Sequence, residues 1–153
     1  MLTIFTIPKP FTDPHIKTIQ TNAIKSWLEL NPKPEIFLFG NEDGTSGLAE
    51  ELKINHIKDT SVNECGTPFL DFIFEYVEKK AKYENICYVN CDIILFQDII
   101  DVISDIYFKE FLIIGQRWDL ELKENIDFTR KDWKDLIIED LNQNGRLHEP
   151  TGS

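Results

Sequence analysis

The sequence is poor in basic residues, and this shortage excludes two classes of partner. It has 16 lysine and arginine residues against 27 aspartate and glutamate residues, which gives a formal net charge of −11. Nucleic acids and anionic membranes bind basic patches, so neither is expected as a partner. An anionic ligand would need a local cation on such an acidic chain. A divalent metal ion, Mn²⁺ or Mg²⁺, is the obvious candidate.

Long apolar runs are also missing. No segment approaches the length of a membrane span, and Met1–Pro8 has neither the basic start nor the apolar length of a signal peptide. The chain has three cysteines, Cys65, Cys87 and Cys91, which cannot all pair with one another and are typical of buried thiols in a reducing compartment. Cys87 and Cys91 share one extended segment, and their spacing favours core packing over metal binding. The sequence therefore predicts a cytoplasmic protein.

Several catalytic signatures are absent as well. The three histidines show no metal-ligand spacing, which argues against a zinc site. There is no G-x-S-x-G elbow and no P-loop, so acyl transfer and nucleotide triphosphate hydrolysis lack their motifs. The turn Gly40–Gly44 lacks the G-x-G-x-x-G spacing of a dinucleotide site.

What the sequence does contain is a regular alternation of strand and helix patterns over one domain, residues 1–153. Hydrophobic residues make up 42% of it, enough for a core. Expected strands are Leu2–Ile7, Glu35–Phe39, Ile54–Ile57, Ile86–Asn90 and Phe111–Gly115. Helices are expected after the Asp13-Pro14 cap, around Leu48–Leu52, from Thr67-Pro68, over Asp98–Tyr107, and from Thr129, with Asp132 completing a capping box, to Gly145. The alternation predicts an α/β fold: a three-layer αβα sandwich with a mostly parallel sheet.

Ligands of such sheets bind beyond the carboxyl ends of the strands. In this chain the predicted strand ends carry Thr6–Pro8, Gly40–Asp43, Asn90–Asp92 and Gln116–Asp119. These four segments are therefore the candidate site.

Asn90 and Asp92 are the most informative of these residues. Period-two alternation puts both side chains on one side of the strand end, with Cys91 pointing away. A carboxylate and an amide so placed suit a diphosphate bound through Mg²⁺ or Mn²⁺, with Asp92 as metal ligand. The alternative is that Asp92 only caps the following turn.

Arg117 is the only basic residue at a predicted strand end near this site, and its guanidinium suits a diphosphate or an acceptor group. The alternative is a surface ion pair with Asp119 or Glu121. Trp118 suits either stacking on a sugar ring or packing over the core.

Two further carboxylates are candidates with plain structural alternatives. Asp43, or its neighbour Glu42, could bind ribose hydroxyls, or both could belong to an ordinary turn. Asp71 could face the nucleotide base, or it could simply complement the dipole of the helix that begins near Pro68.

The run Ile86–Leu95 resembles the strand and DXD-type motif of glycosyltransferases of the GT-A fold, written here as N-x-D. The opening strand with its following helix, and the helix from Pro68, also resemble that fold in element order. The resemblance implies that Thr6 and Pro8 meet the nucleotide of a nucleoside-diphosphate sugar. It also implies a divalent metal on Asp92 and transfer to an unknown acceptor.

Two other readings stay open. A sugar-1-phosphate nucleotidyltransferase has a similar sheet, but Pro8–Asp13 lacks the Gly-rich basic loop typical of that class. A non-catalytic domain with a degenerate transferase core fits the N-x-D motif. The chain is short for a whole GT-A fold, and its polar tail from Gly145 has no closing strand, which favours a truncated product. His148 and Glu149 lie where acceptor-side residues would be, and an exposed sheet edge favours a homodimer.

Overall fold

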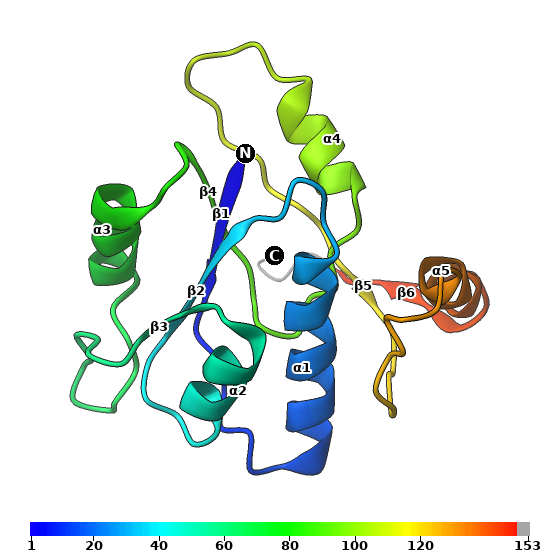
Figure 1. The fold of residues 1–153 in the computed structure, drawn as a ribbon, viewed down its shortest axis with the longest axis horizontal. Coiled ribbons are helices and arrows are strands. Elements are labelled where there is room, and N and C mark those ends of the chain that lie inside the picture. Colours follow the sequence, from blue (N-terminus) through cyan, green and yellow to red (C-terminus); the bar gives the residue numbers. More distant parts are fainter. Residues whose placement is uncertain (150–153) are drawn as a thin grey trace.

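Strands and helices alternate along the chain in the computed structural model, which describes residues 1–149 (Figure 1). The elements are β1 (Leu2–Thr6), α1 (Pro14–Leu28), β2 (Glu35–Phe39), α2 (Thr45–Leu52), β3 (Asn55–Ile57), α3 (Leu70–Lys80), β4 (Asn85–Tyr88), α4 (Asp98–Ser104), β5 (Trp118–Asp119), α5 (Trp133–Asn144) and β6 (Arg146–Leu147). The first four strands form a parallel sheet in the order β3-β2-β1-β4. The α/β class with a parallel sheet is confirmed. The last residues of the polar tail, 150–153, lie outside the described range.

The centre of the sheet is β1, and all five of its residues are buried. Ile4 of this strand is in register with Ile36 of β2 and with Cys87 of β4. Successive side chains point to opposite faces, so Ile4 joins the core cluster under α1 and Phe5 joins the cluster under α3. A strand buried on both faces needs a continuous apolar run, which is what the sequence supplies.

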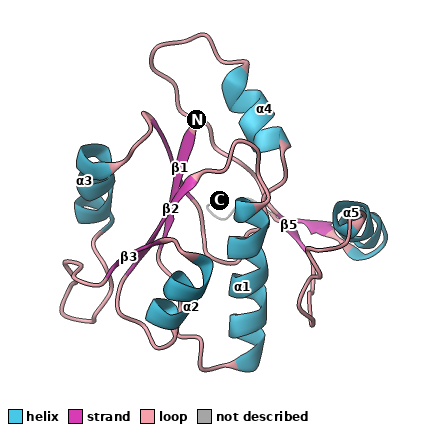
Figure 2. Ribbon diagram, in the orientation of Figure 1, coloured by secondary structure: helices cyan, strands magenta, loops and turns pink. Residues whose placement is uncertain are grey.

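Helices cover both faces of this sheet (Figure 2). Residues of α1, α2 and α4 pack into the cluster on one face, and α3 packs into the cluster on the other. This arrangement is compatible with the expected three-layer sandwich. The start of α1 is the predicted one, because Asp13 caps it by accepting a hydrogen bond of 2.9 Å from the backbone N–H of Ile16.

The inner face of α1 also buries three polar side chains, Gln20, Asn22 and Ser26. Asn22 is 1% exposed, and its amide holds a distant loop at two points. Its Nδ2 donates to the carbonyl of Glu124 and its Oδ1 accepts from the N–H of Ile126, both at 2.9 Å. The helix therefore orders irregular backbone that has no secondary structure of its own.

The predictions fail mainly in the last third of the described chain. Phe111–Gly115 is not a strand, and α4 ends at Ser104 instead of Tyr107. Residues 107–116 make no backbone hydrogen bond to any residue in 1–149. Apolar and β-branched residues gave this segment the local pattern of a strand, but a strand also requires a neighbour to pair with.

The start of α5 and the tail after it also differ from expectation. Asp132 lies at the N-cap without making a side-chain cap bond, because Arg130 binds it through Nε at 2.9 Å and Nη2 at 2.7 Å. Thr129 donates to Asp127 at 2.6 Å instead, so the predicted capping box is wrong. The tail does contain a strand, since β6 pairs antiparallel with β5.

We predict that Asn22→Ala lowers the free energy of unfolding by about 1–3 kcal/mol, because it leaves two backbone groups without their partner. Asn142→Ala is the matched control, since Asn142 is an exposed helical asparagine and its loss should change stability by less than about 0.5 kcal/mol. Urea denaturation followed by circular dichroism measures both values. Equal effects of the two substitutions would show that Asn22 does not hold the 124–126 loop.

Candidate functional site

The sheet has a topological switch point between β1 and β4. From β1 the chain moves outward through β2 and β3, then returns to pair β4 with the other side of β1. The crossover that follows β1 therefore leads away from β4, which lies alone on the other side of β1. Open parallel sheets bind ligands in the crevice that forms at such a point.

A depression of about 150 Å³ lies at this edge of the sheet. Its walls come from three places: the loop after β1, the first half of α1, and the turn after β4. The lining residues are Ile7, Lys9, Ile16, Ile19, Gln20, Asn90, Cys91 and Asp92. The structure thus brings the predicted pair Asn90 and Asp92 together in one depression with residues that the sequence did not single out.

The turn after β4 presents Asn90 and Asp92 to solvent. The N–H of Ile93 donates to the carbonyl of Asn90 at 3.1 Å and closes the turn, while Cys91 between the two polar residues is 5% exposed. Asn90 and Asp92 are thus exposed on either side of a buried Cys91, but β4 ends at Tyr88, so the three residues lie beyond the strand, and Cys91 also lines the depression. The Asp92 carboxylate accepts no hydrogen bond from residues 1–149, so the described structure contains no cap made by this residue.

The chain that follows this turn is fastened to the C-terminal half of α1. The indole Nε1 of Trp27 donates to the carbonyl of Ile93 at 2.9 Å. The hydroxyl of Ser26 accepts from the N–H of Leu95 at 3.1 Å. Both side chains are fully buried, so these bonds fix the position of the turn relative to the helix.

Lys9 is the one cation that lines the depression. Its backbone is clamped by Gln20, whose Oε1 accepts from the Lys9 N–H at 2.7 Å and whose Nε2 donates to the Lys9 carbonyl at 2.9 Å. Lys9 makes no ion pair with residues 1–149. Its backbone is thus held in place while its ammonium group is available to a ligand.

The lining thiol is not a nucleophile. Burial raises the pKa of Cys91 far above its usual range, and the neighbouring Asp92 carboxylate raises it further. Burial also raises the pKa of Cys87, so both thiols are neutral at pH 7. Both pack against the α1 cluster, which confirms their core role, but Cys65 is exposed and corrects the expectation of three buried thiols.

Other predicted site residues lie outside the depression. The side chains of Thr6 and Pro8 are buried, so a ligand at this edge meets Ile7 and Lys9 instead. Asp43 is exposed in the turn after β2, where its carbonyl accepts from the N–H of Phe11 at 2.8 Å.

Asp71 lies in the first turn of α3, the helix on the opposite face of the sheet from α1. It is exposed and borders a second, shallower depression of about 280 Å³. Asp43 and Asp71 therefore remain predictions with no link to the β1–β4 depression in the described structure.

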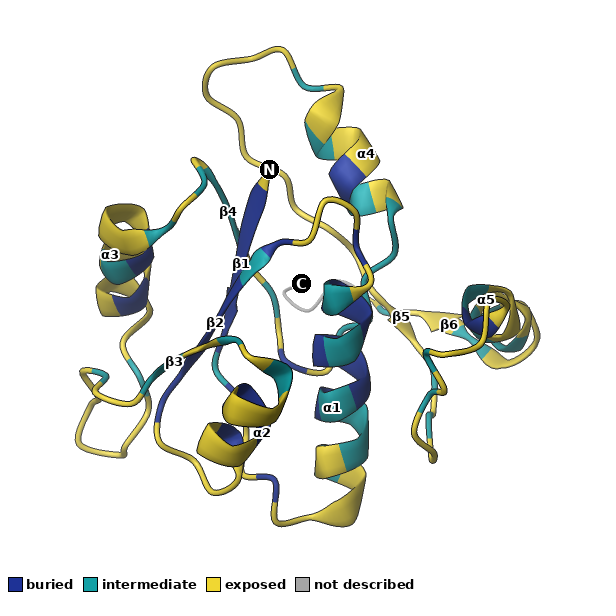
Figure 3. Cartoon of the chain, in the orientation of Figure 1, coloured by how far each residue is buried: buried dark blue, intermediate teal, exposed yellow. Residues whose placement is uncertain are grey.

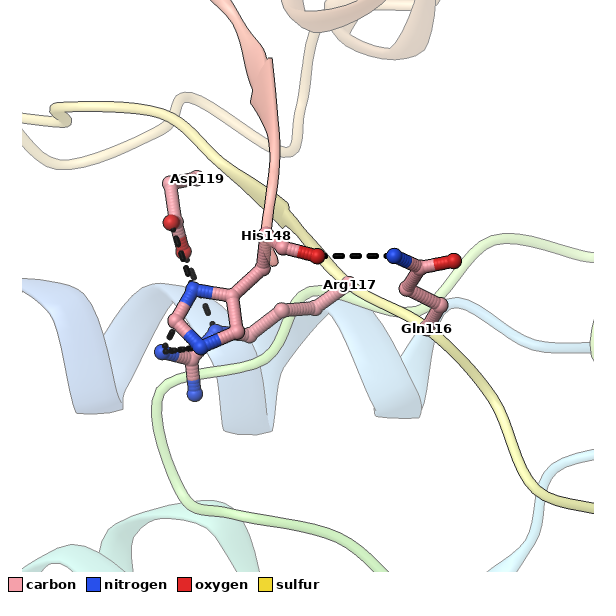
Figure 4. Close-up of polar contacts among 4 residues, drawn as sticks. All are labelled: Gln116, Arg117, Asp119 and His148. Atoms are coloured by element: carbon pink, nitrogen blue, oxygen red, sulfur yellow. Dashed lines mark hydrogen bonds and ion pairs between the residues drawn. The ribbon is translucent and has the colours of Figure 1, made fainter. Parts of the chain in front are cut away.

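Arg117 belongs to a separate cluster on the β5–β6 hairpin, and not to the end of a strand of the parallel sheet (Figure 4). Its Nε pairs with Asp119 Oδ1 at 3.0 Å, and His148 Nδ1 lies 2.7 Å from Asp119 Oδ2. Because a carboxylate only accepts, Nδ1 carries a proton in this contact. The side-chain amide of Gln116 donates to the His148 carbonyl at 2.7 Å and joins the two strands further. Trp118 in β5 is 53% exposed, so it does not cover the core.

The donor set for a metal ion is small. Among residues 1–149 no three His, Cys, Asp or Glu side chains gather closely enough to hold a metal ion. Asp92 with Asn90 nevertheless fits one type of Mg²⁺ site, in which the protein supplies one carboxylate and the other ligands are substrate phosphates and water. Such an ion would arrive with the ligand, because the described residues alone do not make a closed cage.

Comparison with protein-family models, with curated proteins and with solved structures finds no match for this chain. In the described part of the chain no helix is long and apolar enough to cross a membrane. The geometry at the switch point therefore carries the functional argument. The sequence analysis missed two lining residues, Lys9 in the loop directly after the first strand and Gln20 on α1.

We predict that the Asp119 carboxyl titrates below its ordinary pKa, first because of its hydrogen bond to His148 and then because of Arg117. A depressed pKa stabilises the folded hairpin above the unfolded value of about 3.9, and this stabilisation is lost as the pH falls through the folded pKa. NMR titration of the Asp119 carboxyl carbon measures it. His148→Ala should raise the pKa more than Arg117→Ala does, and the reverse order would contradict the assignment.

Proposed function

We propose that this domain binds a nucleoside-diphosphate sugar in the β1–β4 depression and acts as the donor-binding part of a glycosyltransferase with a GT-A-like fold. One observation carries the proposal. The N-x-D pair Asn90 and Asp92 and the unpaired cation Lys9 line a single depression at the topological switch point of a parallel sheet. The strand order, the position of the pair after β4 and the helix that follows β1 all support it.

Five of the residues that line the depression have the following roles in this proposal. The ammonium group of Lys9 pairs with a phosphate, as lysine does in many phosphate sites. The amide of Asn90 donates a hydrogen bond to ribose or to phosphate. Ile16 and Ile19 lie one turn apart on α1 and give the depression an apolar wall. Gln20 positions Lys9 by holding its backbone at both the N–H and the carbonyl.

Asp92 carries the one negative charge among the side chains that line the described depression, close to where the diphosphate would lie. A divalent cation bound there with the ligand would neutralise charge on the departing diphosphate. In the transfer, the bond from the anomeric carbon to the phosphate oxygen breaks and the electron pair leaves with the diphosphate. The oxygen of the acceptor hydroxyl bonds to the anomeric carbon and its proton passes to a base.

A second candidate is a domain that binds the nucleotide sugar without turnover. Asp92 is the only acidic side chain among the residues that line the described depression, and no histidine lines it. If Asp92 serves the cation, the described depression offers no base for the acceptor hydroxyl. The base then has to come from another part of the protein or from a partner.

We predict that UDP, GDP or one of their sugars raises the melting temperature in the presence of Mn²⁺. Lys9→Ala should weaken the binding of that nucleotide about tenfold or more, because a charge-assisted hydrogen bond contributes about 1.5–3 kcal/mol. Asp92→Asn should abolish the part of the affinity that depends on Mn²⁺. Thermal shift identifies the ligand, and isothermal titration with and without EDTA gives the constants.

Two exposed residues outside the depression serve as matched controls, Lys17 on α1 and Asp105 at the end of α4. Lys17→Ala and Asp105→Asn should leave the dissociation constant unchanged. Failure of every nucleotide and nucleotide sugar to bind would refute the proposal. Equal binding by wild type and Lys9→Ala would remove Lys9 from the site.

We predict that wild-type protein releases nucleoside diphosphate from the bound sugar donor when acceptor hydroxyls are supplied, and that Asp92→Asn releases it at least about tenfold more slowly. A coupled assay for free UDP or GDP, run over a panel of sugar acceptors, measures the rate. Tight binding with no release above the uncatalysed rate would assign the domain to the second candidate.

A further inference from the structure

A strongly apolar stretch of the surface comprises residues 107–118, called the 107–118 segment below. It follows α4, extends into the first residue of β5 and is exposed along its length (Figure 3). Its large apolar side chains are Tyr107, Phe108, Phe111, Leu112, Ile113, Ile114 and Trp118, with exposed fractions from 42% to 93%. Soluble monomers rarely leave such a run of large side chains uncovered.

The exposed area is of the size that a stable interface uses. Applied to a burial of ~150–250 Å² for each aromatic side chain, the exposed fractions of the four aromatic residues give roughly 400–650 Å². The three aliphatic side chains add roughly 200 Å². The largest apolar patch of a typical monomer is about 300–600 Å², and a standard interface takes about 800 Å² from each partner. The 107–118 segment therefore approaches what one side of a dimer needs.

Charge favours a second copy of the same chain at this place. The segment holds Lys109 and Arg117 against Glu110, a net charge of +1, on a chain whose net charge is −11. Two copies of an acidic protein repel each other over most of their surfaces. They meet with least repulsion where the local charge is close to zero and the surface is apolar.

The sheet offers a place for the segment to bind. β4 is an edge strand, because one side of it pairs with β1 and no described strand pairs with the other. Residues 107–116 in turn make no backbone hydrogen bond to residues 1–149. Strand addition requires an open sheet edge and an extended segment whose backbone groups are free to pair with it, and this chain has both.

We propose that the protein self-associates through the 107–118 segment, with residues 111–115 of one copy adding as a strand to the β4 edge of a second copy. A two-fold axis lets each copy give its segment and receive the other, so that both edges close and no filament grows. Neither the 107–118 segment nor β4 contributes a residue to the lining of the β1–β4 depression. The proposed interface is therefore independent of the proposed nucleotide site.

Analytical ultracentrifugation over a range of concentrations tests the proposal. Wild-type protein should sediment as a dimer with twice the mass of one chain. Ile114→Lys and Leu112→Lys place a charge at side chains that are 85% and 84% exposed, so each should raise the dimer dissociation constant about thirtyfold or more without affecting folding. Val102→Lys on α4, where Val102 is 52% exposed, is the matched control and should leave the dimer intact.

Hydrogen exchange distinguishes a second copy of the chain from the two other possible partners of the 107–118 segment, which are the β4 edge of the same chain and a different protein. In the dimer the amides of 111–115 should be protected, and Ile114→Lys should release them while its melting curve stays that of a folded protein. A monomer at all concentrations whose 111–115 amides are protected would show pairing within one chain and overturn the proposal. A monomer with freely exchanging amides would leave the surface to a different protein and would overturn it as well.

Discussion

The buried polar side chains of α1 are the constraint on which the described site depends. Gln20, Asn22 and Ser26 lie on the face of the helix that would otherwise be apolar, and each is almost fully buried. A buried polar group without a partner costs on the order of 1–3 kcal/mol, so each of these positions requires a bond to be made. The partners are backbone groups of three different loops, at Lys9, at 124–126 and at Leu95. α1 therefore fixes loops that form no ladder of their own.

This arrangement explains why a polar site can exist on an irregular backbone. The loop after β1 and the turn after β4 come from strands that pair in the sheet, which sets their spacing at the strand ends. Gln20 then fixes one loop, and Trp27 with Ser26 fixes the other, all from a single rigid helix. The two loops consequently cannot shift relative to each other without breaking buried bonds. The backbones of Lys9 and Asp92 therefore keep their relative position, although both side chains are exposed.

The sequence was informative where a local pattern determines the structure. The apolar run of β1 and the Asp13-Pro14 cap of α1 each carry their own physical signal, and the structure has them as expected. The roles of Gln20 and Asn22 could not be predicted from the sequence, because their hydrogen-bond partners are far away in the chain. The strand predicted at 111–115 failed for the same reason. The β propensity of a segment is a local property, but a strand forms only where a distant part of the chain pairs with it. Lys9 was missed because a cation in a loop gives no signal until the loop is placed.

The proposed diphosphate site poses an electrostatic problem, because the chain has a net charge of −11. At physiological ionic strength the Debye length is about 8 Å, so charges elsewhere on the surface are largely screened from a ligand in the depression. Among the lining residues the charge balance is one ammonium group on Lys9 against one carboxylate on Asp92. These two cancel, and a diphosphate would still bring more negative charge than Lys9 alone can neutralise. A cation arriving with the ligand and meeting Asp92 restores the balance, which is the physical reason for expecting the two to bind together.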